Sequence, residues 1–224
     1  MRAFDLDYML GLLPVLLKYL PLTLGMATVS MVLALVLASL LAIIRVAKIP
    51  VLDVLTRVFI SFFRGTPLLV QLFLFYYGLP QLIPSLTAMG GVTAAIIGLT
   101  LHFSAYMAES IRAAILGVDR SQWEAAKAIG MTTAQMMRRI ILPQAARIAS
   151  PTLVNYFIDL IKSTSLAFTL GVTELMGAAQ KEAAGSFLYL ETFVVVALVY
   201  WAIVEVLAVF QRLLEDRLSK AVNR

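Results

Sequence analysis

The spacing of charged residues divides the chain into long apolar runs that predict membrane-spanning helices. No charged residue lies between Lys18 and Arg45, a run of 26 residues, or between Arg64 and Glu109, a run of 44. A bilayer core requires about 20 apolar residues in a helix. The first run therefore predicts one span and the second run predicts two. Turn-forming residues interrupt the middle of the second run: Pro80, Pro84, Gly90 and Gly91.

The two halves of the second run are expected to span at about 66–84 and 92–112, joined by a short loop. Residues 150–171 are apolar except for Asp159 and Lys162, and residues 192–211 are apolar except for Glu205. The predicted fold is an all-α integral membrane protein with about five transmembrane helices, so the two termini should lie on opposite sides.

Composition supports a membrane protein. Hydrophobic residues make up 61% and charged residues 14% of the chain, and the mean hydropathy is +0.92. Soluble domains usually carry about 45–50% apolar and about 25% charged residues, so soluble enzymes and disordered proteins are excluded. With no cysteine and only one histidine, His102, the sequence predicts neither a metal site nor a thiol nucleophile.

The basic residues indicate the orientation. Fourteen of the 18 lie in the first loop, the third loop or the carboxyl-terminal tail, and cytoplasmic loops are enriched in Lys and Arg. The first loop contains Arg45, Lys48, Arg57 and Arg64. We therefore expect an external segment at 1–18, a membrane domain at 19–215 and a cytoplasmic tail at 216–224. The same distribution accounts for the positive charge without nucleic acid as a partner.

The third loop, residues 113–149, is the only long polar segment. Ser121 and Glu124 have the spacing of a capping box that opens a helix. Gly130 is expected to end that helix, and Thr132 or Thr133 to cap a second one that Pro143 breaks. Such a hairpin could simply connect two spans, or it could dock a partner.

A spaced pattern in this loop resembles the EAA loop of binding-protein-dependent ABC-importer permeases, the MetI-like type 1 family. The pattern consists of Glu124, Ala125, Ala126, Gly130, Ile140, Leu142 and Pro143. Phe63-Arg64-Gly65-Thr66-Pro67 and Lys162-x-Thr164-Ser165-Leu166 are similar to the polar amino-acid branch. The resemblance covers about residues 15–215.

The resemblance implies a bacterial inner-membrane permease that pairs with a second permease, two ATPase subunits and an external substrate-binding protein. It assigns coupling to the ATPase to Glu124, Ala125, Ala126, Gly130, Leu142 and Pro143. The chain lacks the phosphate-binding pattern G-x-x-x-x-G-K-[ST]. ATP and Mg²⁺ are therefore expected to be used by a partner, and this chain is expected to bind no cofactor and to be no enzyme.

Polar residues within the predicted spans suggest a substrate pathway, because ionisable groups at bilayer depth tend to face cavities or partners. One stripe on the third span comprises His102, Tyr106 and Glu109. A second group on the fourth span comprises Asn155, Asp159, Lys162, Thr164 and Ser165. Ion pairs of Asp159 with Lys162 and of Glu109 with Arg112 are the static alternative. The polar amino-acid branch usually has Asp where this chain has Ser163, so its substrate specificity does not transfer directly.

The leading function is therefore an ATP-driven importer subunit for a polar amino acid, with cystine, glutamine or basic amino acids favoured. An ion- or proton-coupled secondary amino-acid transporter is the alternative, although inverted repeats are not seen in the sequence. A membrane scaffold without transport would leave the charges inside the spans unexplained.

Overall fold

The computed structural model describes the backbone of residues 4–220 and the side chains of residues 4–213. All the regular structure in this part of the chain is helical, as the sequence predicts. The helices are α1 Leu6–Leu17, α2 Leu20–Ala47, α3 Pro50–Gly65, α4 Leu68–Phe73, α5 Leu79–Leu82, α6 Gly91–Leu116, α7 Arg120–Ala128, α8 Thr133–Met136, α9 Leu142–Ser163, α10 Leu175–Ser186 and α11 Tyr189–Lys220. Short π or 3-10 segments occur at Leu74–Gly78, Pro84–Ala88, Met137–Ile141 and Thr164–Leu170.

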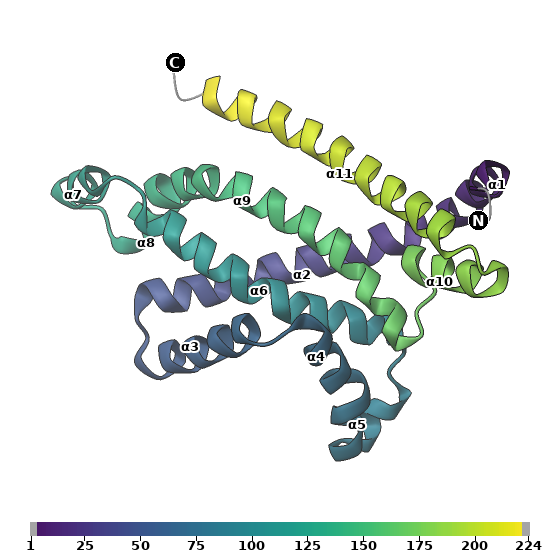
Figure 1. Ribbon diagram of the computed structural model, residues 1–224. Helices are drawn as coiled ribbons and strands as arrows, with labels where there is room; N and C mark the ends of the chain where they lie inside the picture. The colour runs from purple at the N-terminus through teal and green to yellow at the C-terminus, as the bar shows by residue number, and fades with distance from the viewer. Residues whose placement is uncertain (1–3, 221–224) are drawn as a thin grey trace.

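The centre of the bundle is α6, which packs against both α2 and α9 (Figure 1). Small side chains dominate this contact: α2 contributes Ala27, Ala34 and Ala38, and α6 contributes Ala105 and Ala108, all buried. In a membrane, small residues favour association because they let two helix backbones approach closely. The larger buried side chains of α6, Leu99, Phe103 and Met107, belong to the same core cluster.

The helices that could cross a membrane are fewer than the five expected. By length and composition, α2, α6 and α11 qualify among the described residues, and a bent pair formed by α3 and residues 68–82 adds a fourth. Helix α9 contains 22 residues but does not qualify. Its Arg147, Asp159 and Lys162 lower the mean hydropathy, although the helix is long enough to span.

Helix α3 corrects the sequence prediction for the first loop. Residues that were expected to form a cytoplasmic loop are helical, and they bury Thr56, Ile60 and Phe63 on one face. In place of the span expected at 66–84 there is a shorter helical segment, Leu68–Leu82, which qualifies as a candidate span only together with α3, from which it is bent by 110°. Thr66 is extended there, as a residue before proline tends to be.

The helix break expected at Pro143 does not occur. A π-helical segment at Met137–Ile141 continues directly into α9, with Pro143 in its first turn. The Leu142 N–H donates to the Met137 carbonyl, five residues earlier. Proline is tolerated in a first helical turn, where intrahelical N–H bonds are not required. The longer turn therefore lets the chain pass from α8 into α9 without a loop.

The end of the predicted fourth span differs from a simple helix. Helix α9 stops at Ser163, a 3-10 segment follows, and Gly171 adopts a left-handed φ of 79°. Helix α10, which the sequence analysis did not predict, then leads to α11. Gly91 of α6 approaches this turn closely, since a Cβ there would lie 2.6 Å from the Leu170 carbonyl oxygen.

Both ends of the chain are more helical than expected. Within the expected external segment, Asp5 caps α1 by accepting a hydrogen bond from the Tyr8 N–H at 2.9 Å. Helix α1 packs on α10 and α11. At the other end, α11 continues to Lys220, so it includes the start of the segment expected as a tail. Residues 1–3 and 221–224 lie outside the described part.

Candidate functional site

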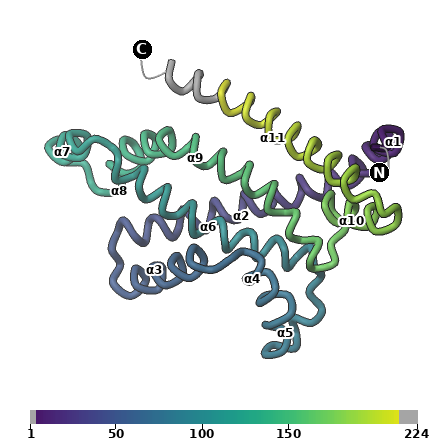
Figure 2. The backbone as a smooth tube through the Cα atoms, viewed as in Figure 1, coloured from purple at the N-terminus to yellow at the C-terminus, as the bar shows by residue number. Residues whose placement is uncertain are grey.

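The predicted coupling loop forms a helical hairpin at the opposite end of the bundle from α1 and α10 (Figure 2). Gly130 follows α7 with a φ of 75°, the left-handed conformation predicted for it. The Thr132 hydroxyl accepts from the Gln135 N–H at 3.3 Å, and the Gln135 side-chain oxygen accepts from the Thr132 N–H at 3.0 Å. These contacts confirm Thr132 as the cap of the second helix and fix the turn between α7 and α8.

The start of α7 corrects another prediction. Asp119, not Ser121, is the capping residue, because its carboxylate accepts from the Ser121 N–H at 2.8 Å. The hydrogen bonds from the Ser121 backbone and side chain hold the pKa of Asp119 below its usual value. Glu124 pairs instead with Arg120, one turn earlier, at 3.2 Å. Both of these side chains are largely exposed, so the pair adds little stability.

The hairpin has a buried face and an exposed face. Ala126 is 1% exposed and packs with Met136 and Ile141 against the end of α6 and the start of α9. Glu124, Ala125 and Gly130 are exposed on the other side. Of the two adjacent alanines, Ala126 holds the hairpin to its own subunit, and Ala125 is exposed. Leu142 and Pro143 are also exposed, at the start of α9.

The polar stripe on the third span lies on α6, and each member has a partner. His102 Nδ1 lies 3.0 Å from the Gln71 side-chain oxygen. The Tyr106 hydroxyl donates to the Arg64 carbonyl at 3.3 Å. Glu109 forms the expected ion pair with Arg112 at 2.7 Å and also lies 3.7 Å from Arg45. Polar contacts thus connect the third span, α6, to α2, α3 and α4.

The fourth-span group separates into exposed and buried members. Asn155, Asp159 and Lys162 are exposed on α9, and the Asp159–Lys162 ion pair measures 2.7 Å with each side chain 52% exposed. The Thr164 hydroxyl donates to the Ile161 carbonyl at 2.6 Å, and Thr164 is buried. Ser165 is half-buried and donates to the Lys162 carbonyl at 2.7 Å.

Tyr156, which the sequence analysis did not single out, joins the two stripes. Its ring centroid lies 6.3 Å from that of Tyr106, and its hydroxyl lies 3.0 Å from the Ser110 hydroxyl. Its position next to Asn155 was the available signal. Through this residue, the α6 stripe and the exposed face of α9 adjoin on one side of the subunit.

A second group that the sequence analysis missed surrounds the fully buried Glu174. Its carboxylate accepts from the Gly177 N–H at 2.8 Å, and the hydroxyls of Thr23 and Tyr200 lie 3.3 and 3.4 Å away. The contacts join α2, α10 and α11. The available signal was an acid isolated among the uncharged residues 163–180.

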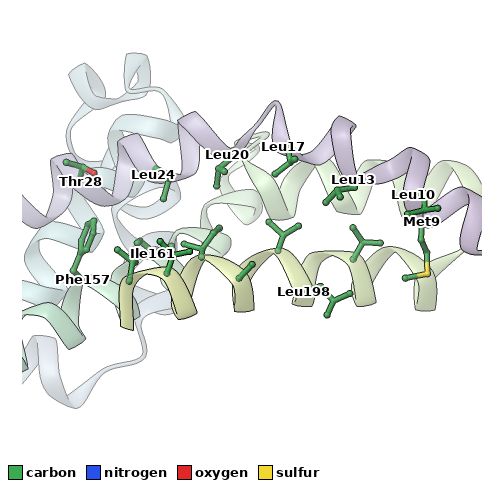
Figure 3. Close-up of a pocket in the computed structure, with 16 residues that line it drawn as sticks. Met9, Leu10, Leu13, Leu17, Leu20, Leu24, Thr28, Phe157, Ile161 and Leu198 are labelled. Atoms are coloured by element: carbon green, nitrogen blue, oxygen red, sulfur yellow. The ribbon is translucent and has the colours of Figure 1, made fainter. Parts of the chain in front are cut away.

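An apolar groove on the described surface lies elsewhere. It has a volume of about 760 Å³ and runs between α1–α2 and α11, as the facing side chains in Figure 3 show. Of its 16 lining residues only Thr28 is polar, and none belongs to the predicted pathway. An uncompensated polar ligand would be poorly solvated there, so this groove does not suit a polar amino acid.

Comparison with known proteins places this arrangement in a family. Residues 30–220 match the family described as "Binding-protein-dependent transport system inner membrane component". A "Probable amino-acid ABC transporter permease protein PatM" of Vibrio harveyi is 62% identical over 222 residues, covering 99% of this chain and 100% of that protein. The L-cystine transport system permease protein TcyL of Bacillus subtilis is 39% identical over 231 residues, covering 100% and 95%.

A solved structure agrees with the sequence relatives. The crystal structure of an amino acid ABC transporter with histidines contains a chain that superposes with a TM-score of 0.90 at 31% identity, covering 97% of this chain and 100% of that one. The secondary-transporter alternative is not retained. Permeases of this family are not themselves enzymes, and they generally work with an ATPase and a binding protein. The chain therefore belongs to the family of binding-protein-dependent inner-membrane transport components, and it is a permease subunit of an amino-acid ABC importer.

Proposed function

We propose that this subunit couples ATP hydrolysis by a partner to the import of a polar amino acid through docking of the α7–α8 hairpin. The observation that carries the proposal is the two-faced hairpin, in which Ala126 is anchored inside the subunit while Glu124, Ala125 and Gly130 remain exposed. A rigid element of this kind can transmit movement between an ATPase and the spans on either side of it. ATP and Mg²⁺ are bound by that partner and not by this chain.

We propose that the hairpin end of the bundle is cytoplasmic. The carboxyl ends of α2 and α6 lie near the hairpin, whereas α1 and α10 lie at the far end (Figure 1). The segments at the hairpin end carry most of the basic residues of the chain, as cytoplasmic segments do. The amino terminus is then external, on the side from which a binding protein delivers substrate.

The substrate pathway in this proposal follows the exposed face of α9 and the adjoining stripe of α6. Asn155, Asp159 and Lys162 are exposed in the isolated subunit, a costly arrangement in contact with lipid. A second permease, identical or related, would enclose this face and create a polar path. The relative named for L-cystine and the structure containing histidines support a polar amino acid, and cystine, glutamine, histidine and basic amino acids form the test panel.

The coupling proposal is tested with Glu124→Lys in the importer complex reconstituted in vesicles. Because Glu124 is exposed, the variant should fold normally, yet charge reversal at a docking contact should reduce ATP-driven uptake about tenfold or more. Asp7→Lys is the matched control, since it reverses an exposed carboxylate on α1 at the other end. Normal uptake and normal retention of the ATPase by Glu124→Lys would contradict the docking role.

Gly130→Pro provides a second test of the hairpin. Proline fixes φ near −65°, whereas Gly130 has a φ of 75° and its N–H donates to the Lys127 carbonyl at 3.0 Å. The variant should change the angle between α7 and α8 while the membrane helices remain folded. Uptake should fall as it does for Glu124→Lys, and coupled transport at the unmutated rate would count against a rigid coupling element.

A further inference from the structure

The sharp bend between α3 and α4 is held by a single buried amide. Gln71 is 1% exposed, and its amide nitrogen donates to the Phe63 carbonyl at 3.0 Å and to the Thr66 carbonyl at 3.1 Å. It also reaches the Thr66 hydroxyl at 2.8 Å, while its oxygen lies 3.0 Å from His102 of α6. These contacts fix the last turn of α3 relative to the polar stripe of α6.

Arg64 is the residue that this bend presents to the stripe. Its guanidinium carbon lies 5.4 Å from the centroid of the Tyr106 ring, and its carbonyl accepts from the Tyr106 hydroxyl at 3.3 Å. Tyr106 lies ten residues before the end of α6 at Leu116, in the middle turns of a helix that spans the membrane. The bend thus places a positively charged, exposed side chain beside the middle turns of α6, next to the proposed pathway.

Arg64 forms no ion pair in the described part of the chain, although Glu109 lies within range of its electrostatic attraction. Among the side chains of residues 4–213, no carboxylate oxygen lies within 4.0 Å of Arg64. Glu109, the acid on the same stripe, is already bound by Arg112 and flanked by Arg45. On α3 itself, Arg57 pairs with Asp53 at 3.0 Å. Arg64 therefore differs from the neighbouring arginines in having an exposed side chain at membrane depth without an acidic partner.

The chemistry of this position favours a carboxylate. A guanidinium binds a carboxylate through two parallel hydrogen bonds, and a tyrosine ring against one of its faces keeps its donors available in the plane. A charged side chain at membrane depth commonly marks a substrate path. All amino-acid substrates carry an α-carboxylate, so a site that binds this group would serve the whole class.

From these observations we infer that Arg64 forms a subsite for the α-carboxylate of the transported amino acid, with Tyr106 orienting the guanidinium and Gln71 fixing the bend. The inference rests on the proposed function, because it places the subsite on the pathway lined by α6 and α9. It adds a residue from α3, a segment that the sequence analysis assigned to a cytoplasmic loop.

The test compares two ligands on the purified permease–ATPase complex in lipid nanodiscs, without the binding protein. The ligands are the amino acid from the panel that the unmutated complex transports and the α-carboxamide of the same amino acid. Arg64→Gln should weaken binding of the acid about tenfold to a hundredfold but leave binding of the amide nearly unchanged. Arg64→Lys, which keeps the charge but not the paired donors, should retain part of the preference for the acid.

Two controls separate recognition from structure. Arg57→Gln removes an arginine of the same helix whose charge is paired with Asp53, so it should leave the preference for the acid intact. Tyr106→Phe keeps the ring but removes the hydroxyl bond to the Arg64 carbonyl, and it should largely preserve that preference. Equal losses for acid and amide in Arg64→Gln would mean that Arg64 is only a structural residue, which would overturn the subsite.

Uptake by reconstituted vesicles distinguishes failure of the subsite from failure of the proposed function. If the unmutated complex shows no ATP-driven uptake of any amino acid in the panel, the proposed function fails and the subsite fails with it. If the unmutated complex shows normal uptake, two results would overturn only the subsite. One is that Arg64→Gln leaves the preference for the acid over the amide unchanged, and the other is that the unmutated complex binds acid and amide equally.

Discussion

Polar residues along α6 and α9 differ in how their charges are compensated. Glu109 is held by arginines from two helices, and Asp159 is held only by its neighbour Lys162 in a pair that is half exposed. An exposed pair contributes about 0.2–1 kcal/mol or less to stability. The Asp159–Lys162 pair is therefore a weak contributor to the fold, and its placement on an exposed face requires another explanation.

Exchange of the two charges tests whether the pair acts on substrate. In a double variant with Asp159→Lys and Lys162→Asp, the ion pair can re-form, so thermal stability should remain within a few degrees of the unmutated protein. If the pair lines the pathway, uptake should still fall about tenfold or more, because each charge faces the wrong group of the substrate. Uptake kinetics of both single variants and the double variant across the panel provide the measurement.

The single variants serve as internal controls for this exchange. Should each single change impair uptake and the double change restore it, the pair would be a static contact between two turns of α9. That result would remove Asp159 and Lys162 from the proposed pathway.

For individual residues, the sequence predicted which polar side chains lie within the spans better than it predicted their hydrogen-bond and ion-pair partners. The three residues His102, Tyr106 and Glu109 do lie on one helix, as their spacing indicated. The i, i+3 spacing also predicted the ion pairs within α6 and α9, which are confirmed. The contacts of His102 with Gln71 and of Tyr106 with Arg64 depend on a bend in another helix. Hydropathy cannot predict such a bend, since it reports which residues are apolar and not the direction that the chain takes.

Helix ends in the coupling hairpin follow local chemistry, and this explains where prediction succeeded. Gly130 and Thr132 were anticipated because a left-handed turn and a capping box involve only neighbouring residues. Ser121 was wrongly chosen as a cap, since Asp119 stands two residues earlier and has a competing side chain that accepts more strongly. Pro143 was wrongly predicted to break the helix. The preceding π-helical turn continues directly into α9, so the chain stays helical although Pro143 has no N–H to donate.

Capping of α7 by Asp119 should depend on pH in a defined direction. Its pKa is lower in the folded protein than the ordinary value of 3.8, so the stabilisation is complete above that value and is lost as pH falls through the folded pKa. Asp119→Ala should expose the α7 amides to about tenfold faster hydrogen exchange at neutral pH. Asp119→Asn, which retains an acceptor oxygen, should show a smaller change without the acid dependence.

Hydrogen exchange followed by mass spectrometry on the α7 peptide measures this directly. Rates at each pH are compared with those of the same peptide free in solution. Equal protection of α7 in Asp119→Ala and the unmutated protein would show that packing of Ala126, and not the cap, holds the helix.

The turn between α9 and α10 depends on close backbone contact. A Cβ at Gly177 would overlap the Val172 carbonyl oxygen, whereas a Cβ at Gly185 of the same helix would meet nothing within 4 Å. Gly177→Ala should therefore destabilise the protein by about 1–3 kcal/mol. Gly185→Ala should be neutral or stabilising by up to about 1 kcal/mol, because alanine restricts the unfolded chain.

Thermal unfolding of the two variants in the same detergent provides the comparison. The buried Glu174 cluster caps α10 beside Gly177, so the Gly177 variant should also loosen the contacts among α2, α10 and α11. If both alanine variants unfold at the same temperature, the turn is able to relax and the close contact is not required.

Burial across the whole molecule is uneven, and it shows which helices remain for other partners. Within the described residues, 56% of the apolar stretch of α6 is buried, compared with 33% for α2 and 17% for α11. Helix α6 is thus an interior helix even in a single subunit, while α2 and α11 are largely left to lipid or to another chain. The overall helical class was predictable from hydropathy, but this division was not, because the most buried helix, α6, is less apolar (mean hydropathy 1.4) than α2 and α11 (2.6 each).

The exposed polar face of α9 should meet a second permease, whereas the apolar groove between α1–α2 and α11 should face lipid. The chain has no cysteine, so single cysteines report these environments without background. Asn155→Cys on α9 should form an inter-chain cross-link in native membranes when it is labelled with a maleimide that carries a photoreactive diazirine, because the diazirine needs no thiol on the partner and because lipid solvates polar side chains poorly. Leu198→Cys, 50% exposed on the groove side of α11, is the matched position and should remain uncross-linked.

Mass spectrometry of the linked product identifies the partner: a product of twice the subunit mass indicates a homodimer, and a different permease indicates a heterodimer. Cross-linking at Leu198 but not at Asn155 would place the interface in the groove, and the α9 face would then no longer qualify as an enclosed pathway.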